Sequence, residues 1–466
     1  MQANPIAPFV TLTMLSKCTH KNNLSISKLY RKVFISGLLP LIFCLSIVSK
    51  AQEVLSLKDA IKIGLENNFD IKIARNDAYL SKESNTYGNA GYLPNASFTA
   101  SNSIQVNDIN QKFSSGLQVE RKGVNTRQTI ASLAANWLFF DGGKMFITKK
   151  KQDATQTAAE IRLQNQIINF SDTLSASYFQ LVLAKLDSRV TLQDISRTEE
   201  RLKIAGEQLR VGVRPKSDAI LAQIDLNILK NKLTSQNYQI EIRKGAFNQL
   251  LGRDPEIQFE VNDSEQSTQN QDFAELKAKV IGQNLQLKLQ QKNLEISKLT
   301  IREVKSRALP QIGLNAAYNF GQTNNQAGFA LFNRSFGPNI GVNVAVPLFT
   351  GISINKLVKL ANIDLETRNL QLKLVENRLL SQLWRSLKNL DNQLENLKFE
   401  SQNITLATEN NEIVKGRFRL GQATSLELKD AENQLSNAQS RLLQARYNAK
   451  IFENQILRLS GELNLL

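Results

Sequence analysis

The stretch NIGVNVAVPLF, residues 339–349, alternates two kinds of side chain and decides what fold the chain can have. Asn339, Gly341 and Asn343 are polar or tiny, whereas every second residue from Ile340 to Leu348 is apolar. A period of two predicts a β-strand with two unlike faces. Most of the chain instead has the charged, helix-forming pattern of long helices, so the question is what the apolar face of this strand contacts.

Three other stretches share the alternation: ASFTASNSIQV at 96–106, TIASLAANWLF at 129–139 and QIGLNAAYNF at 311–320. Each is about ten residues long, which is what a tilted strand needs to cross a bilayer. Their cores carry no charge, whereas exposed strands in water usually do. A soluble hairpin packed on helices is the alternative. The positions expected to face lipid are Phe98, Leu133, Trp137, Ile312, Leu314, Tyr318, Val342, Val344 and Val346.

Four strands cannot close a membrane barrel, and an open sheet edge is not tolerated in lipid. The membrane interpretation therefore requires several chains, and three would supply twelve strands. Pro347, at the end of the fourth strand, is expected where the chain leaves the bilayer and bends into a helix. The equivalent position of the second strand is Leu138, so the two bends should differ in shape.

Residues 1–51 are predicted to be a signal peptide: a basic segment and an apolar run end at Ser49-Lys50-Ala51. An uncleaved membrane anchor is the alternative. Cleavage would remove Cys18, Cys44 and His20, so the mature chain would lack cysteine and histidine. We therefore expect no catalytic residues of those types, no metal site and no cofactor. The net charge would fall from +16 to 16 − 6 = +10, which we assign to solvated helix faces and not to nucleic-acid binding.

The chain is predicted to contain two copies of one layout. YLPNASFTAS at Tyr92 resembles ALPQIGLNAA at Ala308, and RVGVRPKSDAI at Arg210 resembles RLGQATSLELK at Arg419. The Leu-Pro pair of each copy is expected to end a helix. The first repeat spans 52–265, with a strand hairpin at 93–140 and a helical hairpin at 141–252; the second spans 266–466, with hairpins at 309–349 and 350–460.

The helical hairpins show coiled-coil spacing. In the first, a seven-residue series runs from Ile167 through Leu174 and Leu181 to Leu209, broken at Ser188. A related series in the second runs through Leu383, Leu390, Leu397 and Phe418, broken at Asn411. The first long helix, from about 143 to about 211, would measure roughly 100 Å at ~1.5 Å per residue.

The order and duplication of these motifs resemble the TolC family of outer-membrane efflux proteins. The resemblance rests on LSLKDAIKIGLENN, GYLPNASF, LFFDGGK and the two turn motifs VGVRPKSDAI and RLGQATSLELKDAENQL, and it spans residues 53–463. It implies a mainly α homotrimer with four strands per chain in one 12-stranded β-barrel in outer-membrane lipid, and a coiled-coil helical tunnel in the periplasm of a Gram-negative bacterium. Such a channel is the exit duct of a tripartite efflux pump or type I secretion system, joined to an inner-membrane pump through a periplasmic adaptor.

The resemblance also points to the turns between the long helices. Gly212 and Gly421 would end their helices and reverse the chain. In family members, acidic residues six and nine positions past these glycines line the tunnel entrance. Here position six is Asp218 in the first copy and Glu427 in the second, and position nine is Asp430 in the second copy but Leu221 in the first. Solvated acidic residues at a helix start are the alternative. The candidate turn and adaptor-contact residues are Arg210, Gly212, Arg214, Arg417, Phe418, Arg419 and Gly421.

Phe418 departs from the family pattern. Some members have a tyrosine there, bonded to an acidic residue on a neighbouring helix, and phenylalanine has no hydroxyl. We expect arginine–carboxylate pairs involving Asp218 to replace that contact.

Two other functions remain open. One is a non-channel periplasmic coiled-coil protein with soluble hairpins. The other is an enzyme, which the scattered carboxylates and the missing histidine make the weakest candidate. The transported substrate is not readable from the sequence.

Overall fold

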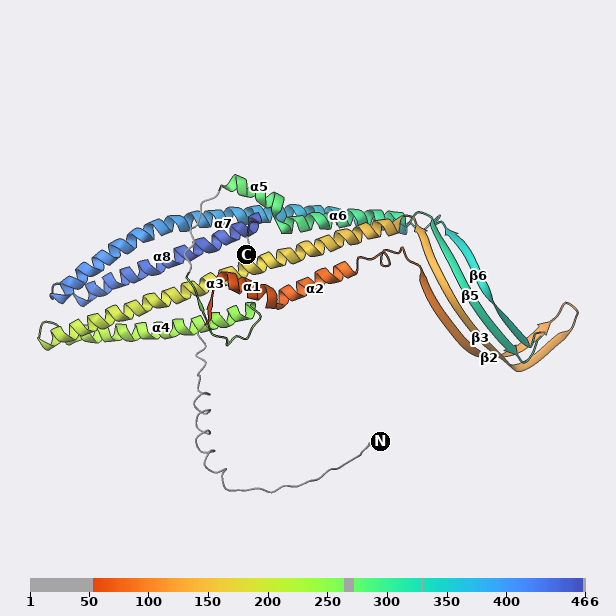
Figure 1. The fold of residues 1–466 in the computed structure, drawn as a ribbon, viewed down its shortest axis with the longest axis horizontal. Helices are drawn as coiled ribbons and strands as arrows, with labels where there is room; N and C mark the ends of the chain where they lie inside the picture. Colours follow the sequence, from red (N-terminus) through yellow and green to blue (C-terminus); the bar gives the residue numbers. More distant parts are fainter. Residues whose placement is uncertain (1–52, 264–271, 329, 464–466) are drawn as a thin grey trace, which may run out of the picture. The chain divides into compact units, whose positions relative to one another are not determined.

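A computed structural model describes residues 53–263, 272–328 and 330–463, and Val54–Leu466 form one compact unit (Figure 1). The predicted signal peptide and the predicted boundary between the repeats lie outside the described residues. The helices are α1 (Leu57–Asn67), α2 (Phe69–Glu83), α3 (Lys144–Arg210), α4 (Lys216–Leu250), α5 (Phe273–Gln283), α6 (Leu285–Ser306), α7 (Ser353–Arg419) and α8 (Ser425–Ser460). The strands are β1 (Glu53–Leu55), β2 (Asn95–Lys112), β3 (Gln118–Asp141), β4 (Phe259–Val261), β5 (Gln311–Asn325) and β6 (Phe332–Ala345).

Four long helices form two antiparallel hairpins, α3 with α4 and α7 with α8 (Figure 1). Helices α3 and α7 each have 67 residues, so each is roughly 100 Å long at ~1.5 Å per residue. Helix α3 begins and ends within a residue of its predicted bounds of about 143 and about 211. Helix α3 also packs on α6 and α8, which joins the two hairpins along their length.

The predicted seven-residue series is buried or half-buried along both helices, as coiled-coil packing requires. On α3 the buried members include Leu174, Leu181 and the polar break Ser188. On α7 they include Leu383 and Leu390. No helix in residues 53–263, 272–328 and 330–463 combines the length and the apolar character needed to cross a membrane.

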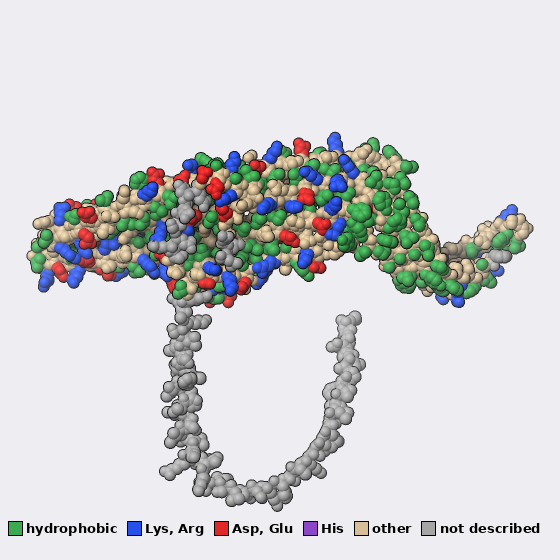
Figure 2. Space-filling view, turned by 45° about the horizontal axis from the view of Figure 1, so that its top comes forward, with side chains coloured by type: hydrophobic (Ala, Val, Ile, Leu, Met, Phe, Trp, Pro, Cys, Tyr) green, Lys and Arg blue, Asp and Glu red, His purple; other side chains and the backbone are tan. Residues whose placement is uncertain are grey.

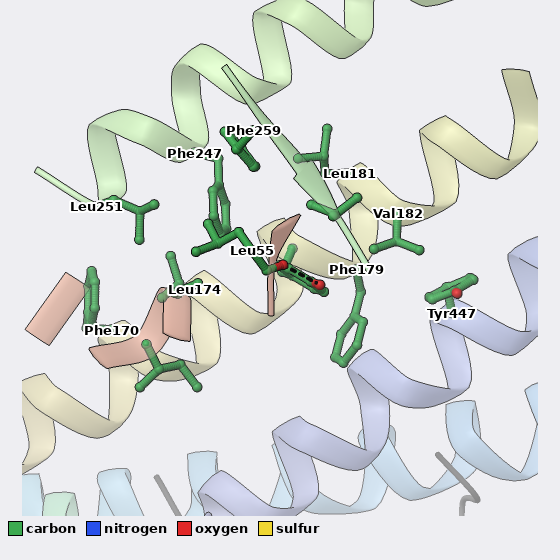
Figure 3. Close-up of a cluster of buried hydrophobic side chains, with 14 of the residues drawn as sticks. Leu55, Phe170, Leu174, Phe179, Leu181, Val182, Phe247, Leu251, Phe259 and Tyr447 are labelled. Carbon is green, nitrogen blue, oxygen red and sulfur yellow. Dashed lines mark hydrogen bonds between the residues drawn. The ribbon is translucent and has the colours of Figure 1, made fainter. Parts of the chain in front are cut away.

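A hydrophobic cluster lies where α1, α3, α4 and the short strands meet (Figure 3). Phe247 of α4 stacks at a tilt on Phe259 of β4, with ring centroids 5.6 Å apart, and both side chains are fully buried. The Tyr178 hydroxyl donates to the carbonyls of Leu55 and Asn262, at 3.0 Å each. Strands β1 and β4 pair with each other and were not predicted from the sequence, because three-residue strands carry no readable period.

Two asparagines start the helices that precede the strand hairpins. The Asn68 carboxamide oxygen accepts from Ile71 N at 3.2 Å, and that of Asn284 accepts from Leu287 N at 3.2 Å. Their amide groups donate to the last turns of the long helices, to Leu250 O at 2.9 Å and Leu459 O at 3.0 Å respectively. The end of α4 thus contacts the start of α2, and the end of α8 contacts the start of α6, each through one hydrogen-bonded asparagine.

The four long strands form one antiparallel sheet in the order β2-β3-β5-β6, so β2 and β6 are its edges. The expected length of about ten residues is wrong: β6 has 14 residues and β3 has 24. The uncharged alternation marks only part of each strand. Backbone pairing continues beyond it through polar and charged residues, because the ladder hydrogen bonds do not depend on side-chain polarity.

The bends from strand to long helix differ, as predicted. Strand β3 continues to Asp141 with a register shift near Leu138, and its carboxylate accepts from Met145 N at 3.0 Å. Strand β6 stops at Ala345, before Pro347. The second bend places Ile352 at φ +66°, a left-handed conformation that is strained for a β-branched residue.

The Leu-Pro pairs do not end both helices as expected. Helix α6 ends at Ser306, close to Pro310, but α2 ends at Glu83, well before Pro94. Residues 84–91 form turns instead, in which the Asn89 amide donates to Ser84 O at 2.9 Å. Local turn chemistry thus stops α2 before proline does.

Candidate functional site at the paired helical turns

The first turn, after α3, closes around Gly212. Gly212 has φ +76°, Val213 N donates to Gln208 O at 2.9 Å, and Gly212 N donates to Leu209 O at 3.0 Å. This is the hydrogen-bond pattern by which a left-handed glycine terminates a helix. Pro215 then begins α4 without a side-chain cap.

The second turn, after α7, repeats that pattern around Gly421, at φ +71°. Gln422 N donates to Arg417 O at 2.8 Å, and Gly421 N donates to Phe418 O at 3.0 Å. The following helix begins differently, because Thr424 and Glu427 form a capping box in which each side chain accepts from the backbone N–H of the other.

The two turns contact each other through Gln208 and Arg214. The Gln208 amide donates to the carbonyls of Phe418 and Arg419, at 3.1 Å each. The Arg214 guanidinium donates to Ala423 O and lies 4.1 Å from the centroid of the Phe418 ring, within cation–π range. The structure therefore joins the ends of the two hairpins within one chain.

Phe418 is fully buried in a small cluster with Ala205, Ala423 and Leu428. Its side chain makes apolar contacts and a cation–π contact. The expected arginine–carboxylate pair also forms, between Arg214 and Asp218 at 2.9 Å, but both belong to the same turn.

Two charge pairs cross from α7 to the first hairpin beside the turns, and both use Glu200 of α3. Its carboxylate pairs with Lys415 at 2.6 Å and with Arg419. Hydrogen bonds from the Lys415 ammonium and then from the Arg419 guanidinium hold the pKa of Glu200 below its ordinary value, against the opposing effect of partial burial. Glu200 thus connects the end of α7 to α3.

The three predicted entrance carboxylates have different surroundings. Asp218 pairs with Arg214. Glu427 is exposed, and its pKa is lowered chiefly by the backbone N–H of Thr424 and then by the Thr424 hydroxyl. Asp430 is exposed on the next turn of α8.

The other two predicted turn residues lie at the helix ends. Arg210 is exposed as the last residue of α3. Arg417 donates to Gln422 O at 3.1 Å and so helps to close the second turn.

A polar stripe on α3 continues from the turns along the contact with α8. Its members are seven residues apart: Asp187, Asp194, Arg201 and Gln208. Asp187 accepts from the Ser440 hydroxyl at 2.8 Å, and Asp194 accepts from the Ser436 hydroxyl at 2.6 Å. At these positions the contact between the two hairpins is therefore polar, unlike the apolar series inside each hairpin.

Arg201 is the most buried charge of this stripe, with a side chain 2% exposed. It pairs with Asp225 of α4 at 2.8 Å and with Glu432 of α8 at 3.2 Å. Burial raises the pKa of Glu432, and the charges of Arg201 and then Arg197 oppose that rise. One guanidinium thus connects three helices.

Sequence reasoning missed Glu200, Gln208, Arg201 and the carboxylates around it. Charged residues at seven-residue spacing on α3 were a readable signal for a polar contact. The partners were not readable, because they depend on how the two hairpins are aligned along their axes. Across the described part of the chain, no group of three or more His, Cys, Asp or Glu side chains is placed to hold a metal ion.

The sheet brings the predicted lipid-facing residues onto one face. Side chains opposite each other on antiparallel strands share a face, and Phe98, Leu133 and Tyr318 are opposite one another in register. Closer to the helices, the same face carries a row of Trp137, Leu314 and Val342. The pair Ile312 and Val344 follows it. Ile312 and Leu314 are half-buried and the others exposed, while Val346 follows the end of β6.

The opposite face of the sheet is polar but uncharged. It carries rows such as Asn95, Asn136, Asn315 and Gly341. Figure 2 shows hydrophobic side chains gathered over the strands, whereas charged side chains are spread over the helices.

The comparisons agree on one family. The model of the family described as "Outer membrane efflux protein" matches residues 276–462. Outer membrane protein TolC of Escherichia coli (strain K12) is 22% identical over 365 residues, covering 76% of this chain and 73% of TolC. Proteases secretion protein PrtF of Dickeya chrysanthemi is 18% identical over 418 residues, covering 86% of this chain and 87% of PrtF.

Solved structures show the same fold. The outer membrane protein VceC of Vibrio cholerae superposes with a TM-score of 0.73 at 15% identity, covering 87% of this chain and 96% of VceC. The CmeC outer membrane channel of Campylobacter jejuni gives a TM-score of 0.74 at 17% identity, covering 87% of this chain and 85% of CmeC. The sequence relatives and the fold agree with the motif order read from the sequence: residues 276–462 match the outer membrane efflux protein family, and the chain is similar to TolC over most of its length.

Proposed function

We propose that three copies of this chain form an outer-membrane channel that is the exit duct of an efflux pump or type I secretion system. Four strands per chain would build a 12-stranded barrel, and the helices would form a tunnel in the periplasm. The chain would catalyse no reaction and would pass on substrates delivered by an inner-membrane pump and a periplasmic adaptor.

The observation that carries this proposal is the two-faced, uncharged part of the sheet. On β5 the outward apolar positions run from Ile312 to Phe320, nine residues, and a tilted strand crosses a bilayer in roughly 9–11. Aromatic residues lie near both ends, with Trp137 and Phe139 at one and Phe320 and Phe336 at the other, as in membrane barrels. The uncharged polar face would then line a water-filled lumen.

The sheet edges support assembly. Strands β2 and β6 have unpaired edges, and lipid does not tolerate such edges. If β6 of one copy pairs with β2 of the next, the edges disappear. The exposed Leu348 and Phe349, at 92% and 82%, would be covered at the same junction.

Two exposed apolar seams on the long helices also support assembly. The α4 seam follows coiled-coil spacing and consists of Leu221, Ile224, Ile228, Tyr238 and Ile242. The α7 seam has one residue every seven and consists of Phe399, Leu406, Ile413 and Leu420. We propose that the α4 seam of one copy packs on the α7 seam of the next.

The two seams match in length and level. Each spans three heptads; the α4 seam begins shortly after the first turn, and the α7 seam ends at the second turn. Leu221 lies nine residues after Gly212 and Ile413 lies eight before Gly421, so an antiparallel pairing would bring Leu221 near Ile413 and Ile228 near Leu406.

The paired turns would form the tunnel entrance and the adaptor contact. Three copies would bring Glu427 and Asp430 close to one axis, where their charges favour cations. Asp218 contributes less free charge, because Arg214 pairs with it. The repeated asparagine contacts of Asn68 and Asn284 support the two-repeat architecture of each chain.

The direct test is reconstitution of the mature protein in planar bilayers, with its oligomeric state measured in parallel. The proposal expects a heat-resistant trimer in detergent and discrete single-channel currents that are larger for cations. A monomer that stays in solution without detergent and gives no currents would support the non-channel coiled-coil alternative instead.

A further inference from the structure

The outward face of the sheet changes character just beyond its apolar part. The last apolar row contains Ala100, Ala131, Phe320 and Phe336. The next row contains Asn102, Thr129, Gln322 and Arg334, and the row after that contains Ile104, Arg127, Asn324 and Phe332. Two arginines therefore follow the apolar rows on the face that the proposed function assigns to lipid.

Arg334 is held in place by neutral partners. Its Nε and Nη2 donate to Gln322 Oε1 at 3.2 and 3.0 Å, and its guanidinium lies 5.4 Å from the centroid of the Phe332 ring. Gln322 and Phe332 are on the same face as Arg334. The Arg334 side chain is thus oriented by neutral groups, and no carboxylate neutralises its charge.

Arg127 is exposed on the same face, one row farther out. No ion pair joins either arginine to a carboxylate within residues 53–263, 272–328 and 330–463. The two rows hold no acidic residue, and the opposite face at the same level carries Ser103, Gln128, Thr323 and Asn333. The positive charge is therefore confined to the outward face and is absent from the proposed lumen.

We propose that Arg127 and Arg334 bind the phosphate groups of lipid headgroups in the outer leaflet. The proposal rests on the proposed membrane barrel, in which the strand turns face away from the helices and so lie at the external surface. A planar guanidinium matches phosphate oxygens with paired hydrogen bonds. Three copies would place six arginines around the barrel, directly above its apolar belt.

Charge complementarity favours lipid phosphate over other anions. A phosphate carried by a lipid is already held at the level where the apolar rows end, next to both arginines. A free phosphate ion would have to lose translational entropy to bind at the same place. Each basic residue near an anionic membrane surface contributes about fivefold to binding. The effect should weaken with added salt, because both arginines are exposed.

The test compares retention of diphosphoryl lipid A with that of the same lipid after removal of its phosphates. Trimers in nonionic detergent doped with equal amounts of both would be washed and analysed by native mass spectrometry. Wild type should favour the phosphorylated form by about fivefold for each arginine, and R127Q/R334Q should retain both forms equally.

The matched control is K112Q/R121Q, which removes the same charge from the part of the β2-β3 hairpin that lies farther out. It should keep the wild-type preference. Equal retention by wild type, or an unchanged preference in R127Q/R334Q, would overturn the lipid proposal. Failure of wild type to form trimers or conduct in the bilayer assay would instead contradict the proposed function.

Discussion

The contact between the two hairpins of one chain and the exposed seams on their outer sides have opposite chemistry. The inner contact includes the polar α3 stripe, in which Asp187, Asp194 and Arg201 meet serines and a glutamate of α8. Gln208, the last member of the stripe, meets carbonyls of the second turn. The outer α4 and α7 seams are apolar and exposed. Residues at the same seven-residue spacing therefore form a polar contact on one long helix and apolar seams on two others.

The difference indicates that the two contacts have different roles, one in the stability of the assembly and one in the alignment of the hairpins. Apolar seams gain stability in proportion to the area removed from water and make no demand on exact alignment. Buried polar contacts add little net stability, but removing one partner of such a contact is costly. The pairing therefore fixes how the helices align. We therefore expect the apolar seams to hold the copies together and the polar stripe to set how the hairpins align.

The largest effect should come from a charge in an apolar seam. I228D and L406D would each bury an unpaired carboxylate in every copy of the interface, at a cost of several kcal/mol each. Both variants should lose the heat-resistant trimer on detergent gels, while circular dichroism shows the helices retained.

The control is N437D, which makes a similar change 209 residues after Ile228, where α8 already has an exposed polar side chain. It should assemble normally. Trimers that persist in both I228D and L406D would show that the exposed seams are not the interface between copies.

A smaller but still large effect should follow removal of Arg201. R201A leaves the carboxylates of Asp225 and Glu432 buried without their shared guanidinium, which costs about 3–5 kcal/mol for a broken buried pair. The midpoint of chemical denaturation should fall accordingly.

The triple variant R201M/D225N/E432Q removes all three charges together. It should recover most of the lost stability, because no buried charge is left unpaired; Lys429, which also pairs with Asp225, is 42% exposed and stays solvated. If R201A denatures like wild type, the buried network does not join the three helices.

Much of this architecture is predictable from the sequence because it depends on local period. The bounds of the long helices follow from seven-residue spacing, and the turns follow from Gly212 and Gly421. The shared face of Phe98, Leu133 and Tyr318 follows from strict alternation along each strand. In each case neighbouring residues carry the information.

The turn chemistry was not predictable, because it depends on alignment between distant helices. Asp218 and Glu427 match in sequence, yet Asp218 pairs with Arg214, whereas Glu427 caps α8 because Thr424 stands where the first turn has Pro215. Glu200 carries no local signal, since its partners Lys415 and Arg419 are more than 200 residues away.

The smallest effect should come from Glu200, whose ion pairs are partly exposed. E200Q should cost about 1 kcal/mol or less and raise single-channel conductance, since α7 would be held less firmly to α3. The lowered pKa means that the stabilising contribution is present above pH 4.5 and is lost as pH falls through the lower folded value. Wild-type conductance should therefore rise in that acid range, and that of E200Q should change less.

The matched control is E199Q, because Glu199 pairs with Lys230 of the same hairpin at 3.4 Å and both side chains are about half exposed. Its conductance should resemble that of wild type. An E200Q channel with wild-type conductance at every pH would show that the ion pairs of Glu200 do not control the channel's conductance.

The central claim, that three copies pack α4 against α7 of a neighbour, is tested most directly by disulfide cross-linking. In a chain with Cys18 and Cys44 replaced by serine, L221C/I413C would place one cysteine in each seam at matching levels, and mild oxidation would follow. A disulfide requires Cα atoms roughly 4.4–6.8 Å apart, so it reports close contact. The account predicts covalent trimers on denaturing gels without reductant. Quantitative oxidation confined to monomers, or no cross-link in a chain that still forms trimers, would contradict it.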